Sequence, residues 1–130
     1  MPHITLEYSA NMDEALDMHA LCVVVKDAAA ATGVFPPAGI RVRAIRCTHS
    51  VIADGDPKHG FIDISVRLRA GRTAEAKSAA TDAIFEAAKA FTADHMGSAP
   101  FMLSLEMRDI DAELSRKESS IRDYLPADMA

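Results

Sequence analysis

A strand–helix–strand pattern that occurs twice along the chain places the strongest constraint on its fold. Segments of alternating apolar and polar residues at 2–8 and about 39–46 flank a stretch with an apolar stripe at helical spacing, and segments at 60–69 and 101–110 flank a second one. Strands joined through a helix pair in parallel by a right-handed connection. We therefore predict two right-handed βαβ units that form one four-stranded mixed sheet with both helices on one face, an α+β or α/β fold.

Capping residues bound the first predicted helix. Asn11 followed by Glu14 resembles a capping box, Gly33 suits a left-handed C-cap, and Pro36 blocks any continuation. The residues expected on the buried face of this helix are Leu16, Ala20, Val23, Val24, Ala28 and Ala31.

The second predicted helix has similar signals. Thr73 is its expected N-cap, Glu75 suits the positive N-terminus, and Gly97, followed by Pro100, is expected to end it. Its expected apolar stripe consists of Ala76, Ala80, Ile84, Ala87, Ala88 and Phe91. Gly33 and Gly97 lie about half the chain apart, so the segments 2–46 and 60–110 are interpreted as a weak pseudo-repeat.

Length and charge exclude several classes of protein. The 130 residues suffice for one domain, 1–130, in which 111–130 is a C-terminal tail with a short helix at about 115–124. The formal charge of −5 argues against nucleic acid as the main partner. The chain has no apolar run long enough for a membrane span and no recognisable signal peptide, so we expect a cytoplasmic protein without a membrane partner.

The usual motifs of metal, cofactor and hydrolytic sites are missing from the sequence. It contains no Gly-rich phosphate loop and no CxxC, HExxH or GxSxG motif, and its histidines and two cysteines are not spaced as metal ligands. We therefore predict that the protein uses neither a metal nor a cofactor.

The sheet face opposite the helices is predicted to be polar. Its expected residues are Thr5, Glu7, Arg41, Arg43, Asp63, Ser65, Arg67, Arg69, Ser104, Glu106 and Arg108. The alternation slips at Ile45, so the second strand is expected to end or bulge there. This face is either solvated or in contact with copies of itself, and the pattern alone leaves both interpretations open.

Pro2 is the candidate base. A small second residue permits removal of the initiator Met1, which would leave Pro2 with a free secondary amine. An α-amino group has a pKa of about 7.7–8.0, and an apolar setting or nearby guanidinium groups lower that pKa toward a value suited to a general base. Proline is also tolerated as the first residue of a strand, so opening the strand is the alternative role.

Two arginines are predicted to lie beside Pro2. Because strands one and two are parallel, Arg41 lies at the same sheet edge as Pro2, and an antiparallel third strand would bring Arg72 back to that edge. Arginine binds carboxylates in a bidentate manner, although a single arginine is commonly solvated or ion-paired. Their convergence on one edge favours an anion-binding site.

The sequence resembles the 5-carboxymethyl-2-hydroxymuconate isomerases of the tautomerase superfamily over essentially its whole length. The segments that carry the resemblance are PHITLEYSAN, TGVFPPAGIRVRA, VIADGDPKHGF, RLRAGRTAEAK, LSLEMRDID and SRKESSIRDYL. The combination of Pro2, the AGIR segment and the AGR segment at these spacings is more specific than an N-terminal proline alone.

The resemblance implies a cytoplasmic homotrimer with sites near its subunit boundaries. Pro2 would move a proton, Arg41 and Arg72 would bind the carboxylates of a small polycarboxylate substrate, and Arg43 would assist. Phe35 and Phe61 are candidate apolar pocket walls, with core packing as the alternative for both. The implied reaction converts the dienol 5-carboxymethyl-2-hydroxymuconate to an unsaturated keto acid during the breakdown of homoprotocatechuate, which is formed from 4-hydroxyphenylacetate.

Two other hypotheses remain open at the level of sequence. The same amine would serve a tautomerase that acts on a different 2-hydroxymuconate or on a phenylpyruvate-like enol acid. Alternatively, the chain is a trimerising binding module without enzymatic activity, in which Pro2 only starts a strand.

Overall fold

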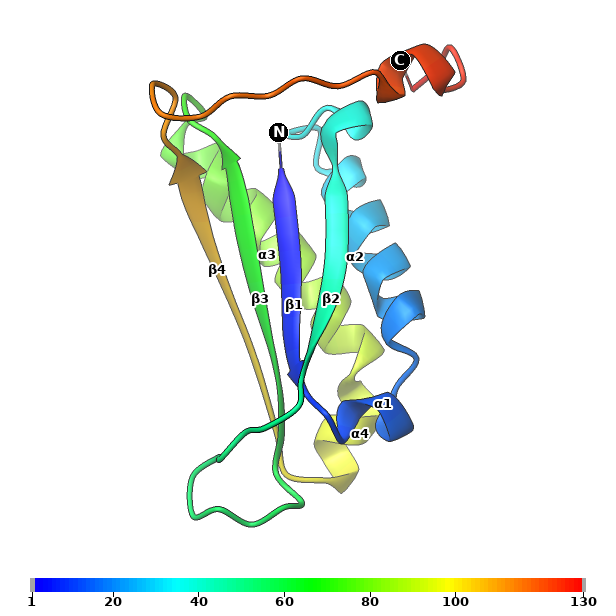
Figure 1. Ribbon diagram of the computed structural model, residues 1–130, viewed down its shortest axis with the longest axis vertical. Helices are drawn as coiled ribbons and strands as arrows, with labels where there is room; N and C mark the ends of the chain where they lie inside the picture. Colours follow the sequence, from blue (N-terminus) through cyan, green and yellow to red (C-terminus); the bar gives the residue numbers. More distant parts are fainter. Residues whose placement is uncertain (1, 130) are drawn as a thin grey trace.

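Four strands form one mixed sheet in the order β2-β1-β3-β4 in the computed structural model, which describes residues 2–129 (Figure 1). The strands are β1 (His3–Ser9), β2 (Arg41–Cys47), β3 (Gly60–Arg69) and β4 (Phe101–Ile110). β1 is parallel to β2 and antiparallel to β3, and β3 is parallel to β4. The predicted mixed sheet is thereby confirmed, and the antiparallel pairing of β1 with β3 fulfils the condition on which the predicted position of Arg72 depended.

Two long helices, α2 (Met18–Ala31) and α3 (Ala74–Phe91), cover the same face of the sheet (Figure 1). The short helices α1 (Met12–Ala15) and α4 (Ala93–Ser98) lie at the end where β1 finishes. Two 3₁₀ turns, η1 (Pro37–Gly39) and η2 (Ile121–Tyr124), lie at the opposite end. No helix within residues 2–129 is long and apolar enough to cross a membrane.

The hydrophobic core fills the space between the sheet and the two long helices. The inward residues of the central strands are Ile4, Leu6, Ile62, Ile64, Val66 and Leu68. The helices contribute Leu21, Val25, Ala29, Ala80, Ile84 and Ala88. Alternation of these residues with polar ones leaves the other sheet face open and polar, as predicted.

The first helical region is broken, which corrects the capping-box prediction. Asn11 precedes α1 but makes no side-chain cap, and α1 ends at Ala15. The Asn11 side chain is used elsewhere, since its Nδ2 donates to the carbonyl of His59 at 2.9 Å and its Oδ1 accepts from Ser9 at 2.6 Å. Asn11 therefore anchors the long connection instead of capping the helix.

A new cap at Asp17 starts α2 and shifts the phase of its buried face. Leu16 has an extended backbone, and the Asp17 carboxylate accepts a hydrogen bond from the backbone N–H of Ala20 at 3.0 Å. The buried residues are Met18, Leu21, Val25 and Ala29, and the last three each follow an expected residue by one position. Val23, predicted to be inward, is 41% exposed.

The ends of β2 and α3 also differ from the predictions. β2 continues in register to Cys47, and Ile45 lies on the open face opposite Glu7, so there is no end or bulge at Ile45. α3 ends at Phe91, where the buried Thr92 hydroxyl donates to the Ala88 carbonyl at 2.9 Å. Gly97 consequently lies within α4 instead of ending α3.

The C-terminal tail forms less helix than predicted, whereas the other caps agree. Residues 116–120 are all polar and have no apolar face to bury, and only η2 is helical in this region. Thr73 accepts a hydrogen bond from the N–H of Ala76 at 3.1 Å, and Gly33 has φ +72°, as a left-handed cap requires.

Removal of the α2 cap should destabilise the protein. In a urea titration we expect Asp17→Ala to lower the free energy of unfolding by about 1 kcal/mol, because the N–H of Ala20 loses its acceptor. Asp17→Asn should retain most of that stability. Asp27→Ala is the control, since Asp27 lies on the same helix in a surface pair with Lys26 and should cost less than about 0.5 kcal/mol. Equal losses for Asp17→Ala and Asp27→Ala would contradict the assignment of Asp17 as the cap.

Candidate functional site

A backbone hydrogen bond connects Pro2 to the start of β2. The Pro2 carbonyl accepts a hydrogen bond from the N–H of Arg41 at 3.2 Å, and the Pro2 ring is buried. The turn η1 ends at Gly39, just before Arg41. The N–H of Ile40 closes this turn by donating to the Pro37 carbonyl at 3.2 Å. Pro2 and Arg41 therefore lie at one end of the sheet, as the sequence predicts.

Arg41 has buried donors that no residue within 2–129 satisfies. Its Nε and Nη2 are buried and have no hydrogen-bond partner among the described residues. Arg41 as a whole is half-buried, but each buried N–H donor without an acceptor is costly because it has left water without gaining another partner. An anion from outside the chain would satisfy these donors.

His3 lies within a row of arginines on the open face. It is in register with Arg41 on one side and Arg67 on the other, and Arg67 is in register with Arg108. Burial, followed by the charges of Arg41, Arg67 and Arg43, lowers the pKa of His3 to about 4. His3 is consequently neutral at physiological pH, and this end of the open face is strongly cationic.

Arg43 belongs to the same cationic group but is exposed. Its Nη1 lies 3.3 Å from Nδ1 of His3, where the guanidinium donates to a neutral imidazole. Arg43 lies two residues after Arg41 on β2, in register with Thr5, and therefore on the same face of the sheet.

Arg72 enters the site from a turn after β3. Gly71 has φ +111°, a conformation that glycine tolerates, and the turn carries Arg72 back toward η1. Nε and Nη2 of Arg72 donate to the carbonyl of Val34 at 3.3 and 3.0 Å. This neutral anchor fixes the guanidinium without cancelling its charge.

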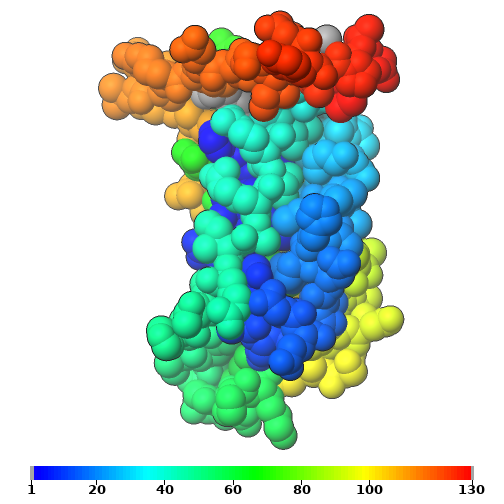
Figure 2. Space-filling view, turned by 45° about the vertical axis from the view of Figure 1, so that its right-hand side comes forward, coloured from blue at the N-terminus to red at the C-terminus, as the bar shows by residue number. Residues whose placement is uncertain are grey.

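A pocket of about 590 Å³ opens beside Arg72. Its wall comprises Ala38 and Gly39 of η1, Arg69 and Ile110 at the ends of β3 and β4, and residues of the tail. Figure 2 shows the tail, coloured orange to red, as a cap over this end of the molecule. Among the described residues, Pro2 and Arg41 do not line the pocket, although they lie at the same end of the sheet.

The two candidate phenylalanines differ in position, and only Phe61 lies far from Pro2 in this chain. Phe35 is 3% exposed and packs in the core, the alternative role considered for it. Phe61 lies at the far end of β3, where its N–H donates to Ser9 Oγ at 3.0 Å. The prediction that Phe61 lies near Pro2 is wrong. Because β3 is antiparallel to β1, the start of β3 lies beside the end of β1.

Several basic residues at this end were not among the site residues predicted from the sequence. His3 follows Pro2 directly in the sequence, and that position could have marked it as a site residue. Arg69 was assigned only to the polar sheet face, although it lies three residues before Arg72. Lys117 and Arg122 of the tail also line the pocket, and no spacing rule could have placed them there.

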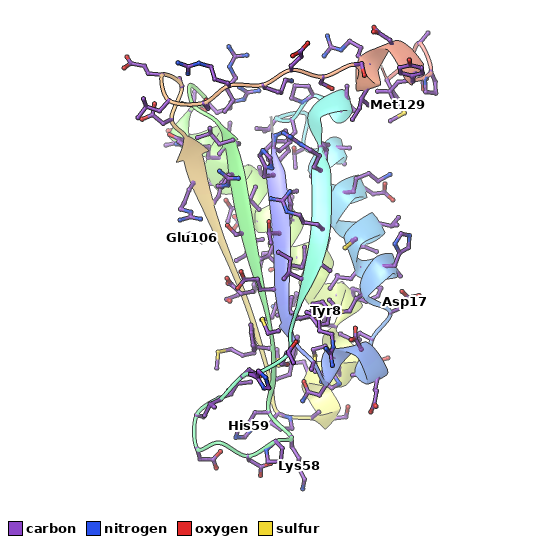
Figure 3. The ribbon with its side chains drawn as sticks, viewed as in Figure 1. Tyr8, Asp17, Lys58, His59, Glu106 and Met129 are labelled. Atoms are coloured by element: carbon purple, nitrogen blue, oxygen red, sulfur yellow. The ribbon has the colours of Figure 1, made fainter. Side chains whose placement is uncertain are left out.

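The long connection between β2 and β3 contributes nothing to this pocket. Figure 3 places His59 and Lys58 at the opposite end of the molecule from the tail. His59 Nε2 lies 2.6 Å from Asp54 Oδ1, and the backbone N–H of Asp56 and this histidine together lower the pKa of Asp54. Within residues 2–129, no three His, Cys, Asp or Glu side chains gather in a metal-binding arrangement.

Comparison with known proteins agrees with this geometry. The family model for 5-carboxymethyl-2-hydroxymuconate isomerase matches residues 2–125. The 5-carboxymethyl-2-hydroxymuconate Delta-isomerase of Escherichia coli is 33% identical over 121 residues, which are 93% of this chain and 96% of that protein.

Solved structures support the same relationship. A 5-carboxymethyl-2-hydroxymuconate isomerase from Deinococcus radiodurans R1 superposes with a TM-score of 0.87 at 30% identity, covering 96% of this chain and 95% of that one. A 5-carboxymethyl-2-hydroxymuconate delta-isomerase gives 0.88 at 28% identity, covering 95% and 92%. A fused 4-OT structure, at 0.61 and 23% identity, covers 83% of this chain and 85% of that one and shares the fold.

The sheet, the paired βαβ units and the cationic end define an isomerase with a tautomerase-like fold. The chain belongs to the family of the 5-carboxymethyl-2-hydroxymuconate isomerases.

The protonation of His3 gives a direct test of the cationic end. In an NMR titration we expect the His3 imidazole to titrate near pH 4, well below its ordinary value of 6.5. Because the folded state disfavours the charged form, the contribution of His3 to stability is complete above pH 6.5 and is lost as the pH falls toward 4. His3→Gln should remove that part of the acid destabilisation. A His3 that titrates near 6.5 would contradict the described electrostatics.

Proposed function

We propose that the protein isomerises 5-carboxymethyl-2-hydroxymuconate, with the amine of Pro2 as the acid and base. The single observation that supports this most strongly is the presence of Pro2, the unsatisfied Arg41 and the anchored Arg72 at one end of the sheet. The family match makes this substrate the first to test.

The proposed reaction transfers one proton and moves one double bond. The Pro2 amine removes the proton from the 2-hydroxyl group of the dienol, and the oxygen electron pair forms a C=O bond as the adjacent C=C bond shifts. The conjugated chain then accepts a proton at carbon from the Pro2 ammonium, which regenerates the neutral amine. Substrate and product are isomers, so the balance requires no further reactant.

The surroundings of Pro2 favour a neutral amine once Met1 has been removed. Pro2 is buried, and burial lowers the pKa of an amine because it disfavours the ammonium form. Nearby guanidinium groups act in the same direction, as they do for His3. An amine with a pKa near the working pH exchanges protons efficiently in both directions.

The arginines supply binding and charge stabilisation. Arg41 has free donors for a carboxylate or for the developing enolate oxygen, and Arg72 is held in place by Val34 beside the pocket. Arg43 contributes to the positive field from the open face.

We further propose a homotrimer with sites near subunit boundaries. Two fused 4-OT structures that share the fold are described as symmetric trimers. The exposed Ile45 and Met102 on the open face suit contact with another copy. The proposal extends to a cytoplasmic enzyme that acts in homoprotocatechuate breakdown.

An activity assay with variants of the N-terminus tests the role of Pro2. We expect Pro2→Ala to lower kcat/KM by at least about 100-fold, because a primary amine replaces the positioned ring nitrogen. A form that retains a residue before Pro2 should be inactive, since its Pro2 nitrogen is an amide. Mass spectrometry of each preparation identifies the N-terminus. Full activity in the extended form would contradict the amine mechanism and favour another role for Pro2.

Substitution of Arg41 should lower activity without lowering stability. Arg41→Gln should lower kcat/KM by about 100-fold or more, while the free energy of unfolding should stay the same or rise because a buried unpaired charge is removed. Arg46→Gln is the control on the same strand, where Arg46 pairs with Asp13 at 3.0 Å at the other end, and it should leave kcat/KM unchanged. A loss of stability without loss of activity in Arg41→Gln would contradict the proposed role.

A further inference from the structure

We propose that Lys117 and Arg122 in the tail bind the third carboxylate of the substrate and select tricarboxylates over dicarboxylates. This inference rests on the proposed function, because it concerns the carboxymethyl arm of the same substrate. The tail (residues 111–129) would then act as a specificity element added to the sheet.

The path of the tail brings these side chains over the pocket. After β4 the Asp111 carboxylate accepts hydrogen bonds from the N–H groups of Glu113 and Leu114 at 2.8 and 2.9 Å, which turns the chain. The chain then crosses the end of the sheet toward η2, beside η1 (Figures 1 and 2). Lys117 and Arg122 both line the pocket as a result.

The pocket contains far more positive than negative charge. Its lining includes the cations Arg69, Arg72, Lys117 and Arg122 and one carboxylate, that of Asp123. Within residues 2–129, none of these four cations forms an ion pair with a carboxylate. In an acidic protein, this collection of unpaired cations around one cavity favours a polyanionic ligand.

The cations at this end of the sheet are numerous enough for a triacid. Arg41 and Arg72 suffice for two carboxylates near the reacting dienol, whereas a third carboxylate on a side arm needs a cation farther from Pro2. The tail provides Arg122, whose guanidinium can bind bidentately, and Lys117, whose ammonium is a point charge. The pocket volume of about 590 Å³ lies in the usual range for small-molecule sites.

Arg116 offers a matched control in the same segment. Its Nη1 donates to the carbonyls of Glu113 and Ser115 at 2.8 and 3.0 Å, and it does not line the pocket. Arg116→Gln therefore removes the same charge from the tail without removing a pocket cation. Any effect of net charge or tail folding should appear in Arg116→Gln as well as in Arg122→Gln.

Steady-state kinetics with two substrates tests the inference. We expect Arg122→Gln to lower kcat/KM for 5-carboxymethyl-2-hydroxymuconate by about 10- to 100-fold and for 2-hydroxymuconate, which lacks the third carboxylate, by less than about threefold. Lys117→Gln should show the same selectivity with a smaller loss, and Arg116→Gln should change neither value. An equal loss for both substrates, or no loss for the triacid, would overturn the inference.

Calorimetric binding separates this inference from the proposed function. Propane-1,2,3-tricarboxylate and glutarate serve as unreactive triacid and diacid probes. The wild type should bind the triacid at least about tenfold more tightly, and the double variant Lys117→Gln/Arg122→Gln should lose that preference. If the wild type isomerises neither substrate, the proposed function fails while this binding preference still supports the tail site. Equal affinity of the wild type for both probes, or a preference that persists in the double variant, would overturn it.

Discussion

The antiparallel pairing of β1 with β3 determines where the parts of the site lie. Because β1 also pairs in parallel with β2, its first residue has the start of β2 on one side and the end of β3 on the other. Arg41 and Arg72 thereby lie at the end of the sheet where β1 begins, although they are far apart in sequence. A sheet with β1 and β3 in parallel would put Arg72 at the wrong end of the molecule.

The cationic end lowers the folding stability of the protein but favours the binding of an anion. Arg41 has buried donors without partners in the described part of the chain, and burial among arginines keeps His3 neutral. Neither feature stabilises an empty site, and both are relieved by an anion. The core formed by the central strands and the two long helices supplies the folding stability that offsets the cost of these groups.

The alternation of apolar residues and the two βαβ units were sufficient to predict the four strands and the mixed sheet, and they placed Pro2 and Arg41 at one end of it. They were insufficient where a distant contact decides the local structure. Asn11 is recruited by the carbonyl of His59, 48 residues away, so the helix breaks and restarts at Asp17 with a different buried face. The tail has no periodicity to bury, and its course over the pocket depends on the completed sheet.

The pKa of the Pro2 amine measures the central claim most directly. NMR titration of protein labelled with ¹⁵N in proline would report the Pro2 nitrogen. If the sheet brings an amine base into a cationic, buried setting, this nitrogen should titrate well below the ordinary range of about 7.7–8.0 for an α-amino group. A Pro2 nitrogen that is an amide in the native protein, or one that titrates within or above the ordinary range, would contradict the account.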